Sequence, residues 1–301
     1  MTMTTDATRP VVAGLGEVLW DLLPEGRTLG GAPANLVYHA RALGAEAVLV
    51  SAVGDDPAGR EILDRLRAVG IDCRHVAVDR EHPTGTVTVA LGPKGVPQFT
   101  IHERVAWDFV PWDPALAELA SRCDAVCYGS LAQRSPVTRR TIREFLKAVR
   151  AGCLRVFDIN LRQAYYDRES IHALLLLSDV LKINDEEIPV VARLIGLMGG
   201  EAEWVDALFD RYPLRCVALT RGSRGSLLAA RGERSVHPGI PAVNIADTVG
   251  AGDAFTASLV LGMLRKRPLD AINEAANRLA AFVCTQPGAM PDVPESLRNL
   301  L

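Results

Sequence analysis

The chain has 301 residues, 49% of them hydrophobic, which is enough apolar material for one large α/β domain or for two smaller ones. A net charge of −3 excludes a broad basic surface for nucleic acid or anionic membranes, so a small anionic ligand would need a local site. The six cysteines are scattered without a C-x-x-C pair, which favours buried free thiols in a cytoplasmic protein over a zinc site or a disulfide framework.

The first segment, residues 1–10, is polar, lacks the apolar core of a signal peptide and is expected to be disordered. After it, short apolar runs alternate with amphipathic stretches. The longest apolar runs are about ten residues, shorter than the roughly 20 that a bilayer crossing needs. The apolar runs predict strands at residues 11–18, 46–54, 124–128, 154–159, 179–183 and 215–220.

The amphipathic stretches have helical spacing and are often bounded by proline and glycine. They predict helices at residues 33–44, 57–70, 136–151 and 171–177, further helices up to about 212, and long helices at 251–265 and 269–284. Alternation of strands and helices predicts an α/β fold with a mostly parallel sheet covered by helices on both faces. We expect residues 1–301 to form a single domain.

One stretch departs from this alternation. Residues 86–103 alternate polar and apolar side chains around a Gly-Pro-Lys-Gly turn, which predicts an antiparallel hairpin with one polar face. A hairpin inserted in a parallel α/β core often serves as a lid over a site. An edge hairpin without such a role fits the pattern equally well.

The most informative segment is DTVGAGDAF, residues 247–255. Gly250 and Gly252 allow a tight turn that leads directly into a helix, whose free N–H groups can bind an anion. A carboxylate at Asp253 would repel a bound phosphate, but it suits a base that takes a proton from an attacking hydroxyl. The alternative is that Asp253 only caps the helix.

Other nucleotide-binding signatures are missing from the sequence. It contains no G-x-x-x-x-G-K-[ST] loop and no protein-kinase signature. The pair Gly14 and Gly16 lies on the first strand, but Leu19 occupies the position of the third glycine of G-x-G-x-x-G. A Rossmann oxidoreductase is therefore disfavoured.

From about residue 11 to residue 294 the sequence resembles the ribokinase-like (PfkB) family of carbohydrate kinases. DTVGAGDAF is similar to the family's C-terminal signature, and GGAPAN, residues 30–35, to its N-terminal signature. The segments GEVLWD, LGGAPAN, PTGTVTV, FDINLR and LKINDEE most resemble fructokinases. The resemblance implies a three-layer sandwich whose small β lid is formed by residues of about 18–32 and 84–110.

The resemblance also implies a role for each matching residue. Asp253 would be the catalytic base, beside an anion hole formed by Gly250, Ala251 and Gly252. Sugar contacts would come from Asp21, Gly30, Gly31, Asn35, Arg104, Asp158 and Arg162. ATP and Mg²⁺ would be bound by Asn184, Glu187, Thr220, Gly222, Gly225 and Asn277, with Glu187 acting on the metal through water. A monovalent cation such as K⁺ would be bound by Asp247, Val249 and Gly288.

One further position bears on the substrate. Arg134 stands about where ribokinases have a sugar-binding glutamate, which argues against ribose as the substrate. Asp158, in FDINLR, either lines the site or is purely structural.

The resulting hypothesis is an ATP-dependent kinase that phosphorylates a primary hydroxyl of a small sugar, with fructose as the first choice. 2-Keto-3-deoxygluconate, another sugar or a nucleoside are the alternative acceptors. A non-catalytic sugar or nucleotide sensor is the alternative of another class. Members of this family often pair through their lids, so we expect a homodimer.

Overall fold

The computed structural model describes residues 9–23, 26–91, 97–241 and 244–301. Most of the N-terminal segment that was expected to be disordered, residues 1–8, lies outside the described residues. The predicted Gly-Pro-Lys-Gly turn at 92–95 lies outside them as well.

The described residues contain a nine-stranded central sheet in the order β13-β12-β11-β10-β9-β8-β1-β4-β5. Seven strands are parallel, and all of them except β5 were predicted: β1 (Val11–Leu15), β4 (Glu46–Gly54), β5 (Val76–Asp79), β8 (Ala125–Tyr128), β9 (Leu154–Asp158), β10 (Val180–Asn184) and β11 (Cys216–Thr220). An antiparallel hairpin extends one edge: β12 (Ser226–Ala230) and β13 (Glu233–His237). All the parallel strands therefore end at one edge of the sheet.

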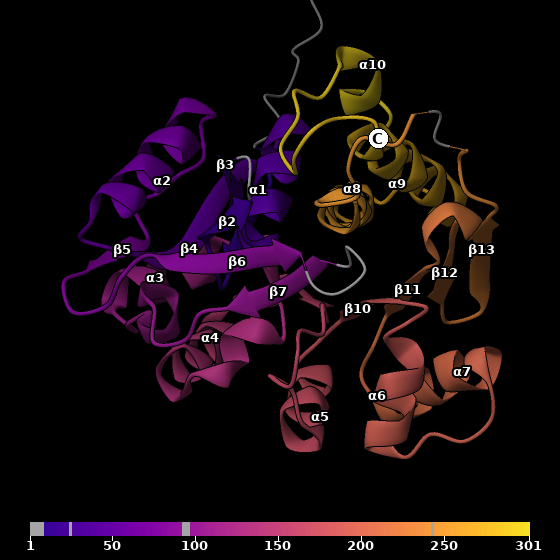
Figure 1. Cartoon of the computed structure of the whole chain (residues 1–301). Helices are drawn as coiled ribbons and strands as arrows, with labels where there is room; N and C mark the ends of the chain where they lie inside the picture. The colour runs from indigo at the N-terminus through magenta and orange to yellow at the C-terminus, as the bar shows by residue number, and fades with distance from the viewer. Residues whose placement is uncertain (1–8, 24–25, 92–96, 242–243) are drawn as a thin grey trace, which may run out of the picture.

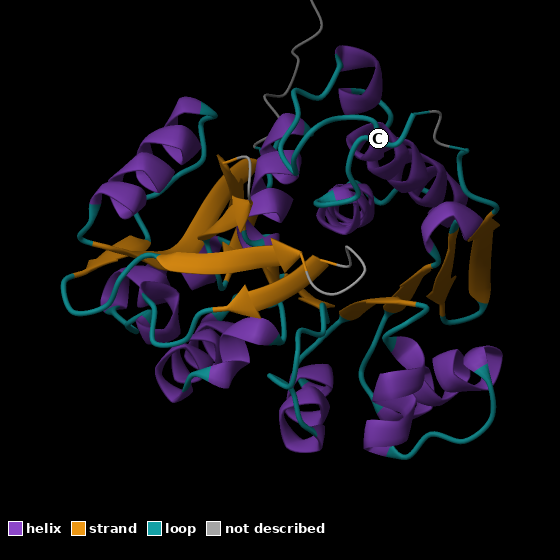
Figure 2. Ribbon diagram, in the orientation of Figure 1, coloured by secondary structure: helices purple, strands orange, loops and turns teal. Residues whose placement is uncertain are grey.

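Helices cover both faces of this sheet (Figures 1 and 2). One face packs against α1 (Ala32–Ala42), α2 (Pro57–Ala68), α8 (Ala251–Leu264) and α9 (Leu269–Cys284). The other packs against α3 (Pro114–Arg122), α4 (Pro136–Ala148), α5 (Arg168–Leu176), α6 (Ile188–Ile195) and α7 (Glu201–Arg211). Strands such as β1 are buried at every residue, which explains their continuous apolar sequence.

A second, smaller sheet has four strands in the order β3-β2-β6-β7 and contains the segments expected to form a lid; we call it the lid sheet, or the lid. Its strands are β2 (Leu19–Leu23), β3 (Gly26–Gly30), β6 (Gly85–Leu91) and β7 (Pro97–Ile101). The predicted hairpin is confirmed, because β6 pairs antiparallel with β7 and Val87 lies opposite Ile101. A small cluster that includes Leu19, Val87 and Trp107 packs beneath the lid.

The predicted strand at residues 11–18 is wrong beyond Leu15. At Gly16 the backbone turns with φ of 145°, and the chain then leaves the central sheet and enters the lid at Leu19. A Cβ at Gly16 would lie 2.9 Å from the ring of Pro33. The first strand and the lid are thus joined by a sharp corner at the carboxyl edge of the sheet.

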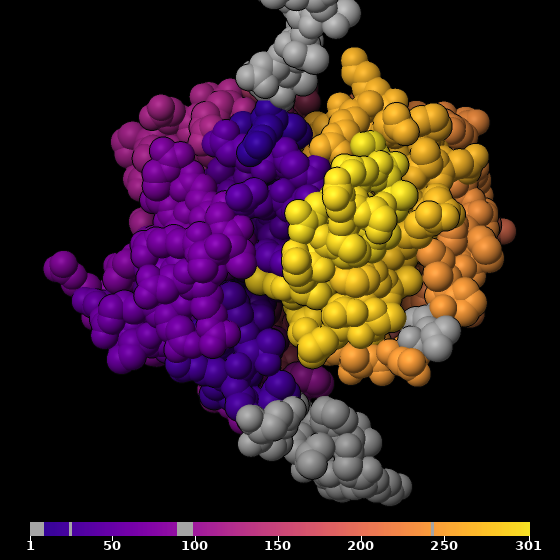
Figure 3. All heavy atoms as spheres, turned by 90° about the horizontal axis from the view of Figure 1, so that it is seen from above, coloured from indigo at the N-terminus to yellow at the C-terminus, as the bar shows by residue number. Residues whose placement is uncertain are grey.

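The N-terminal and C-terminal parts of the chain pack directly against each other (Figure 3). The Tyr38 hydroxyl donates to Pro291 O at 2.9 Å, and His39 Nε2 lies 2.9 Å from Ala289 O. These contacts place α1 beside the loop that follows α9. The bond between Asn35 and Asp253 places α1 beside α8 as well, so the two signature motifs meet.

The six cysteines are free thiols, as predicted, and five of them are buried. Burial raises the pKa of Cys216 to about 12, which makes this thiol unreactive near neutral pH. Within the described ranges, no helix is long and apolar enough to span a bilayer.

Candidate active site

The N-terminus of α8 is built on a glycine that no other residue can replace without strain. Gly250 is the N-cap of α8 and has φ of 81°. A Cβ at this position would lie 2.6 Å from the Cβ of Ala289. The amides of Ala251, Gly252 and Asp253 follow in the first turn, where helix N–H groups lack intrahelical acceptors. The turn therefore presents donors and the positive end of a helix dipole.

Asp253 lies in this first turn and is linked to α1. Its Oδ2 accepts a 2.8 Å hydrogen bond from Asn35 Nδ2. Burial, followed by the charge of Asp158, raises the pKa of Asp253 to about 6, while Asn35, Lys182 and Arg162 oppose that rise. No side chain caps α8, which argues against the capping interpretation of Asp253. A carboxyl with this pKa is ionised at neutral pH and basic enough to accept a proton.

The predicted sugar contacts on the lid side surround a second carboxyl, that of Asp21. A Cβ at Gly30 would lie 2.4 Å from Asp21 Oδ2, so only glycine leaves room for the carboxylate. Gly31 has φ of 113°, and a Cβ there would lie 2.4 Å from Glu17 O. Burial raises the pKa of Asp21 to about 6, with the charge of Arg162 opposing it. Asp21 thus lies at the carboxyl edge within the electrostatic field of Arg162.

Glu17 also lies at the candidate site, although none of the predicted roles was assigned to it. It is 3% exposed, and its Oε1 accepts a 3.3 Å hydrogen bond from Ala32 N at the start of α1. Burial raises the pKa of Glu17 to about 7, and the charge of Asp253 contributes to the rise. The signal in the sequence was an acidic residue directly after a buried strand, in GEVLWD.

Asp158 has both carboxylate oxygens engaged within the protein. Its Oδ1 lies 3.0 Å from Lys182 Nζ, and its Oδ2 accepts a 2.7 Å hydrogen bond from Thr256 Oγ1. The residue is 6% exposed. These contacts favour the structural alternative for Asp158 over direct contact with a sugar. They also bring Lys182, which the sequence did not single out, next to α8.

Asn184 and Glu187 bind each other's backbone at the end of β10. Asn184 Oδ1 accepts from Glu187 N at 2.8 Å, and Glu187 Oε2 accepts from Asn184 N at 3.0 Å. Glu187 Oε1 accepts from Leu161 N at 2.9 Å, which ties in the segment after β9. Each carboxylate oxygen of Glu187 already accepts a hydrogen bond from a backbone amide. The pair Asn184 and Glu187 therefore suits Mg²⁺ bound through water better than Mg²⁺ bound directly.

The turn between β11 and β12 contains the predicted nucleotide contacts Thr220, Gly222 and Gly225. Thr220 ends β11 at the carboxyl edge, next to Asn184 in the register. Gly225 has φ of 80°, and a Cβ there would lie 2.0 Å from His237 O, so the turn requires glycine.

Asn277, also predicted to contact the nucleotide, lies in a buried network behind this turn. Its Nδ2 donates to Ser226 Oγ at 2.7 Å and to Asn273 O at 2.8 Å. These contacts are internal, and they hold α9 against β12.

The two segments predicted to bind a monovalent cation lie together. Asp247 N lies 3.3 Å from Cys284 O, and Asp247 Oδ1 accepts from Val249 N at 3.0 Å. Gly250 packs against Ala289, directly after Gly288. Backbone carbonyls and a carboxylate are suitable oxygen donors for such a cation.

Three arginines surround the lid side of the site. Arg104, with φ of 54°, and Arg162 are exposed, and neither forms an ion pair among the described residues. The side chain of Arg134 is 6% exposed and pairs with Asp108 through two hydrogen bonds of 2.8 and 2.9 Å. Its guanidinium also lies 4.0 Å from the ring centroid of Trp107. The charge of Arg134 is therefore already compensated, whereas Arg162 acts on the site carboxyls.

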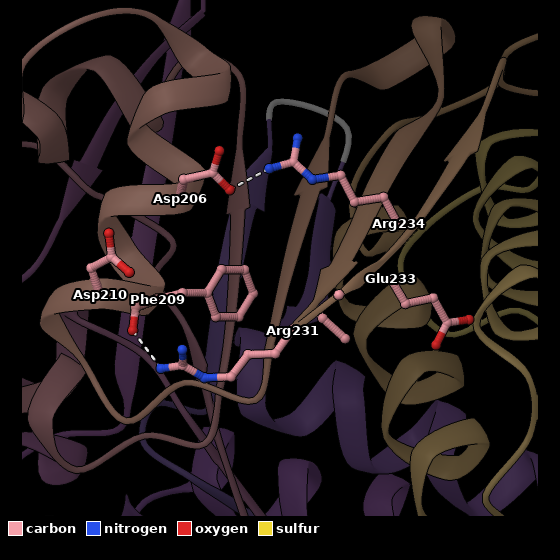
Figure 4. A pocket seen from close by; sticks show the side chains of 8 residues that line it. Asp206, Phe209, Asp210, Arg231, Glu233 and Arg234 are labelled. Atoms are coloured by element: carbon pink, nitrogen blue, oxygen red, sulfur yellow. Dashed lines mark hydrogen bonds and ion pairs between the residues drawn. The ribbon is translucent and has the colours of Figure 1, made fainter.

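A surface pocket of about 630 Å³ lies elsewhere, between α7 and the β12–β13 hairpin. Figure 4 shows that Arg234 pairs with Asp206 and that Arg231 donates to Phe209 O. None of the predicted site residues lines it. We therefore assign the chemistry to the carboxyl edge of the sheet.

Comparisons with known proteins support this assignment. Residues 25–296 match the model of the pfkB family carbohydrate kinases. Over 298 residues, 93% of this chain and 95% of the relative, the sequence is 33% identical to a fructokinase of Klebsiella pneumoniae.

Two solved structures share the fold. One is the fructokinase of Vibrio cholerae O395 in its fructose-, ADP- and calcium-bound form, with a TM-score of 0.79 and 26% identity over 96% of this chain and 97% of that one. The other is an uncharacterized sugar kinase of Pyrococcus horikoshii in complex with ATP, with a TM-score of 0.80 and 25% identity over 97% of this chain and 99% of that one. These matches confirm the predicted ribokinase-like fold. The chain belongs to the pfkB family of carbohydrate kinases.

Proposed function

We propose that the protein transfers the γ-phosphoryl group of ATP to a primary hydroxyl of a small sugar, with fructose as the first choice. The observation that carries this proposal is the position of Asp253. Its carboxyl, with a pKa raised to about 6 by burial, stands in the first turn of α8 beside amides that lack helical acceptors. A proton acceptor and an anion site thus lie within one turn of helix.

In the proposed reaction, Asp253 accepts the proton of the sugar hydroxyl. The hydroxyl oxygen forms a bond to the γ-phosphorus, the bond from that phosphorus to the bridging oxygen breaks, and ADP leaves with the electron pair. The amides of the expected anion hole, Gly250, Ala251 and Gly252, stabilise the negative charge on the transferred group. Mg²⁺, held through water by Asn184 and Glu187, would neutralise phosphate charge. The lid sheet would exclude water and so suppress hydrolysis of ATP.

Fructose is favoured because a fructokinase is 33% identical to this chain and another fructokinase is among the solved structures with the same fold. 2-Keto-3-deoxygluconate, another sugar or a nucleoside remain the alternative acceptors. Vicinal hydroxyls of a sugar can bind the carboxylate of Asp21 and the amide of Asn35. The absence of a side chain at Gly30 and Gly31 lets the sugar approach the backbone closely.

The test is a screen of purified protein against sugars, sugar acids and nucleosides, with ADP release measured by a coupled assay. The proposal predicts the highest kcat/KM for fructose. A higher kcat/KM for 2-keto-3-deoxygluconate or a nucleoside would make that compound the acceptor, and the protein would still be a kinase. Absence of ADP release with every acceptor would favour the sensor alternative.

We also propose that the protein is cytoplasmic and forms a homodimer through the lid. Separately, we propose that Asp247, Val249 and Gly288 bind K⁺. The free thiols fit a reducing compartment. The outer lid strands β3 and β7 have no further partner strand among the described residues, and Phe99 on β7 is 58% exposed. Light scattering and a comparison of activity in K⁺ and Na⁺ salts test these two points.

A further inference from the structure

Lys182 extends from β10 toward the first turn of α8. A Cβ added at Gly252 would lie 3.0 Å from Lys182 Nζ, so the ammonium lies directly against that glycine. The Lys182 side chain is 9% exposed and that of its partner Asp158 is 8% exposed. A buried cation therefore lies at the end of the helix where the structure also presents free amides.

The position of this cation is fixed from two sides. Asp158 Oδ1 holds Lys182 Nζ at 3.0 Å, and Asp158 Oδ2 is held by Thr256 Oγ1 at 2.7 Å. Thr256 lies one turn after Gly252 in α8, so the ion pair is tied to the same helix. A buried ion pair contributes little net stability compared with apolar residues of the same size. Its presence beside the anion site therefore suggests an electrostatic role.

We propose that Lys182 is a positioning residue for phosphoryl transfer, a fixed positive charge that keeps Asp253 ionised and strengthens the anion site at the N-terminus of α8. This inference rests on the proposed kinase function. Lys182 acts through Asp253 and the first turn of α8.

Several charged groups face Asp253 and determine how it titrates. Asp158 from β9 raises the pKa of Asp253, whereas Lys182 from β10 and Arg162 from the segment after β9 lower it. Glu17 couples to Asp253 from the end of β1. Burial alone would lower the pKa of Lys182, but the carboxyls of Asp158, Glu187 and Asp253 outweigh burial and raise it. The ammonium thus stays charged wherever Asp253 titrates.

The first test replaces the cation by an apolar side chain of similar length, Lys182→Met. The pH profile of kcat should keep its shape while its acid limb moves to higher pH by about one unit, because a nearby opposite charge lowers a carboxyl pKa by about 1–3 units. At pH 7 this shift should lower kcat about twofold, and loss of the positive charge beside the anion site should lower it further, while the KM for the sugar should change less. An unchanged acid limb would overturn the proposal.

Two matched variants separate charge from packing. Lys182→Arg keeps the charge, so its acid limb should stay within a few tenths of a pH unit of the wild type. Thr256→Val removes the hydroxyl bond to Asp158 but keeps the ammonium, and it should shift the limb less than Lys182→Met. Equal shifts in all three variants would indicate a purely structural role for Lys182 and contradict the proposal.

Asp158→Asn should move the acid limb in the opposite direction. It provides a second test if Lys182→Met does not fold. Removing the Asp158 charge should lower the pKa of Asp253 and move the acid limb to lower pH, provided that Lys182 remains charged. A shift to higher pH would refute this electrostatic account.

A readout without turnover separates this inference from the proposed function. The carboxyl of Asp253 can be titrated by ¹³C NMR in aspartate-labelled wild type and in Lys182→Arg and Lys182→Met. If no acceptor is phosphorylated but the pKa of Asp253 rises only in Lys182→Met, the charge coupling holds and the kinase proposal fails. If turnover occurs but the pKa of Asp253 is the same in all three proteins, the role of Lys182 is refuted.

Discussion

Asn35 and Asp253, 218 positions apart in the sequence, are joined by a 2.8 Å hydrogen bond from the amide of one to the carboxylate of the other. Asn35 lies in the first turns of α1, after the glycine pair of the lid, and Asp253 lies in the first turn of α8. The bond therefore connects the lid side of the site to the anion site. It orients the carboxylate and favours its ionised form.

Asn35→Leu should lower kcat/KM about tenfold and move the acid limb of its pH profile upward. Loss of a hydrogen bond to a charged group costs about 1.5–3 kcal/mol, and part of that appears as a higher pKa of Asp253. Steady-state kinetics between pH 5 and pH 9 measure both effects. Tyr38→Phe is the control on the same helix, because it loses only the bond to Pro291 O. Similar losses in both variants would count against the orienting role of Asn35.

Glu17 should make the protein less stable as the pH rises. Because burial raises its pKa from 4.5 to about 7, the folded state binds the proton more tightly than the unfolded state does. The free energy of unfolding therefore falls between about pH 4.5 and pH 7, by about 3 kcal/mol in all from this group. Glu17→Gln removes that loss, so it should be more stable than the wild type at pH 8 and similar to it at pH 4.5.

Urea unfolding at the two pH values measures this difference. Asp21 and Asp253 also have raised pKa values and remain in the variant, so part of the pH dependence should persist. Equal stability of Glu17→Gln and wild type at pH 8 would show that folding does not raise the pKa of Glu17.

Gly250→Ala should damage both stability and activity. The positive φ costs about 1 kcal/mol for any residue with a Cβ, and the methyl group would also displace Ala289 from the start of α8. Gly152→Ala is a matched control, since Gly152 has φ of 87° and nothing within 4 Å of the added Cβ. Thermal unfolding and kcat should show a larger loss for Gly250→Ala. Equal stability and normal kcat in the two variants would show that a Cβ at Gly250 does not disturb the start of α8.

Much of the architecture could be predicted because buried parallel strands have continuous apolar sequences. The limits of β4 and α9 match the predicted ranges. The turn before α8 could also be predicted, because a backbone with positive φ at Gly250 requires a glycine in the sequence. The hairpin β12–β13 was missed because its outer strand is largely exposed and has no clear alternation.

The charged residues beneath the site could not be predicted in the same way. A lysine inside LKIN reads as a solvent-facing position, and only tertiary packing shows that Lys182 meets Asp158 and that Asp158 meets Thr256, 98 positions away. The role of Glu17 could not be predicted for the same reason, because its burial depends on the packing of α1 and the lid. The sequence shows which residues have reactive groups, and the fold decides which of these groups touch.

The most direct measurement is the turnover of Asp253→Asn with ATP and the best acceptor from the screen. Loss of a general base lowers kcat by roughly 10²–10⁴-fold, whereas ATP and sugar should still bind, as followed by calorimetry. That result is expected if Asp253 accepts the proton of the attacking hydroxyl. A variant that keeps near-normal kcat would contradict the central claim.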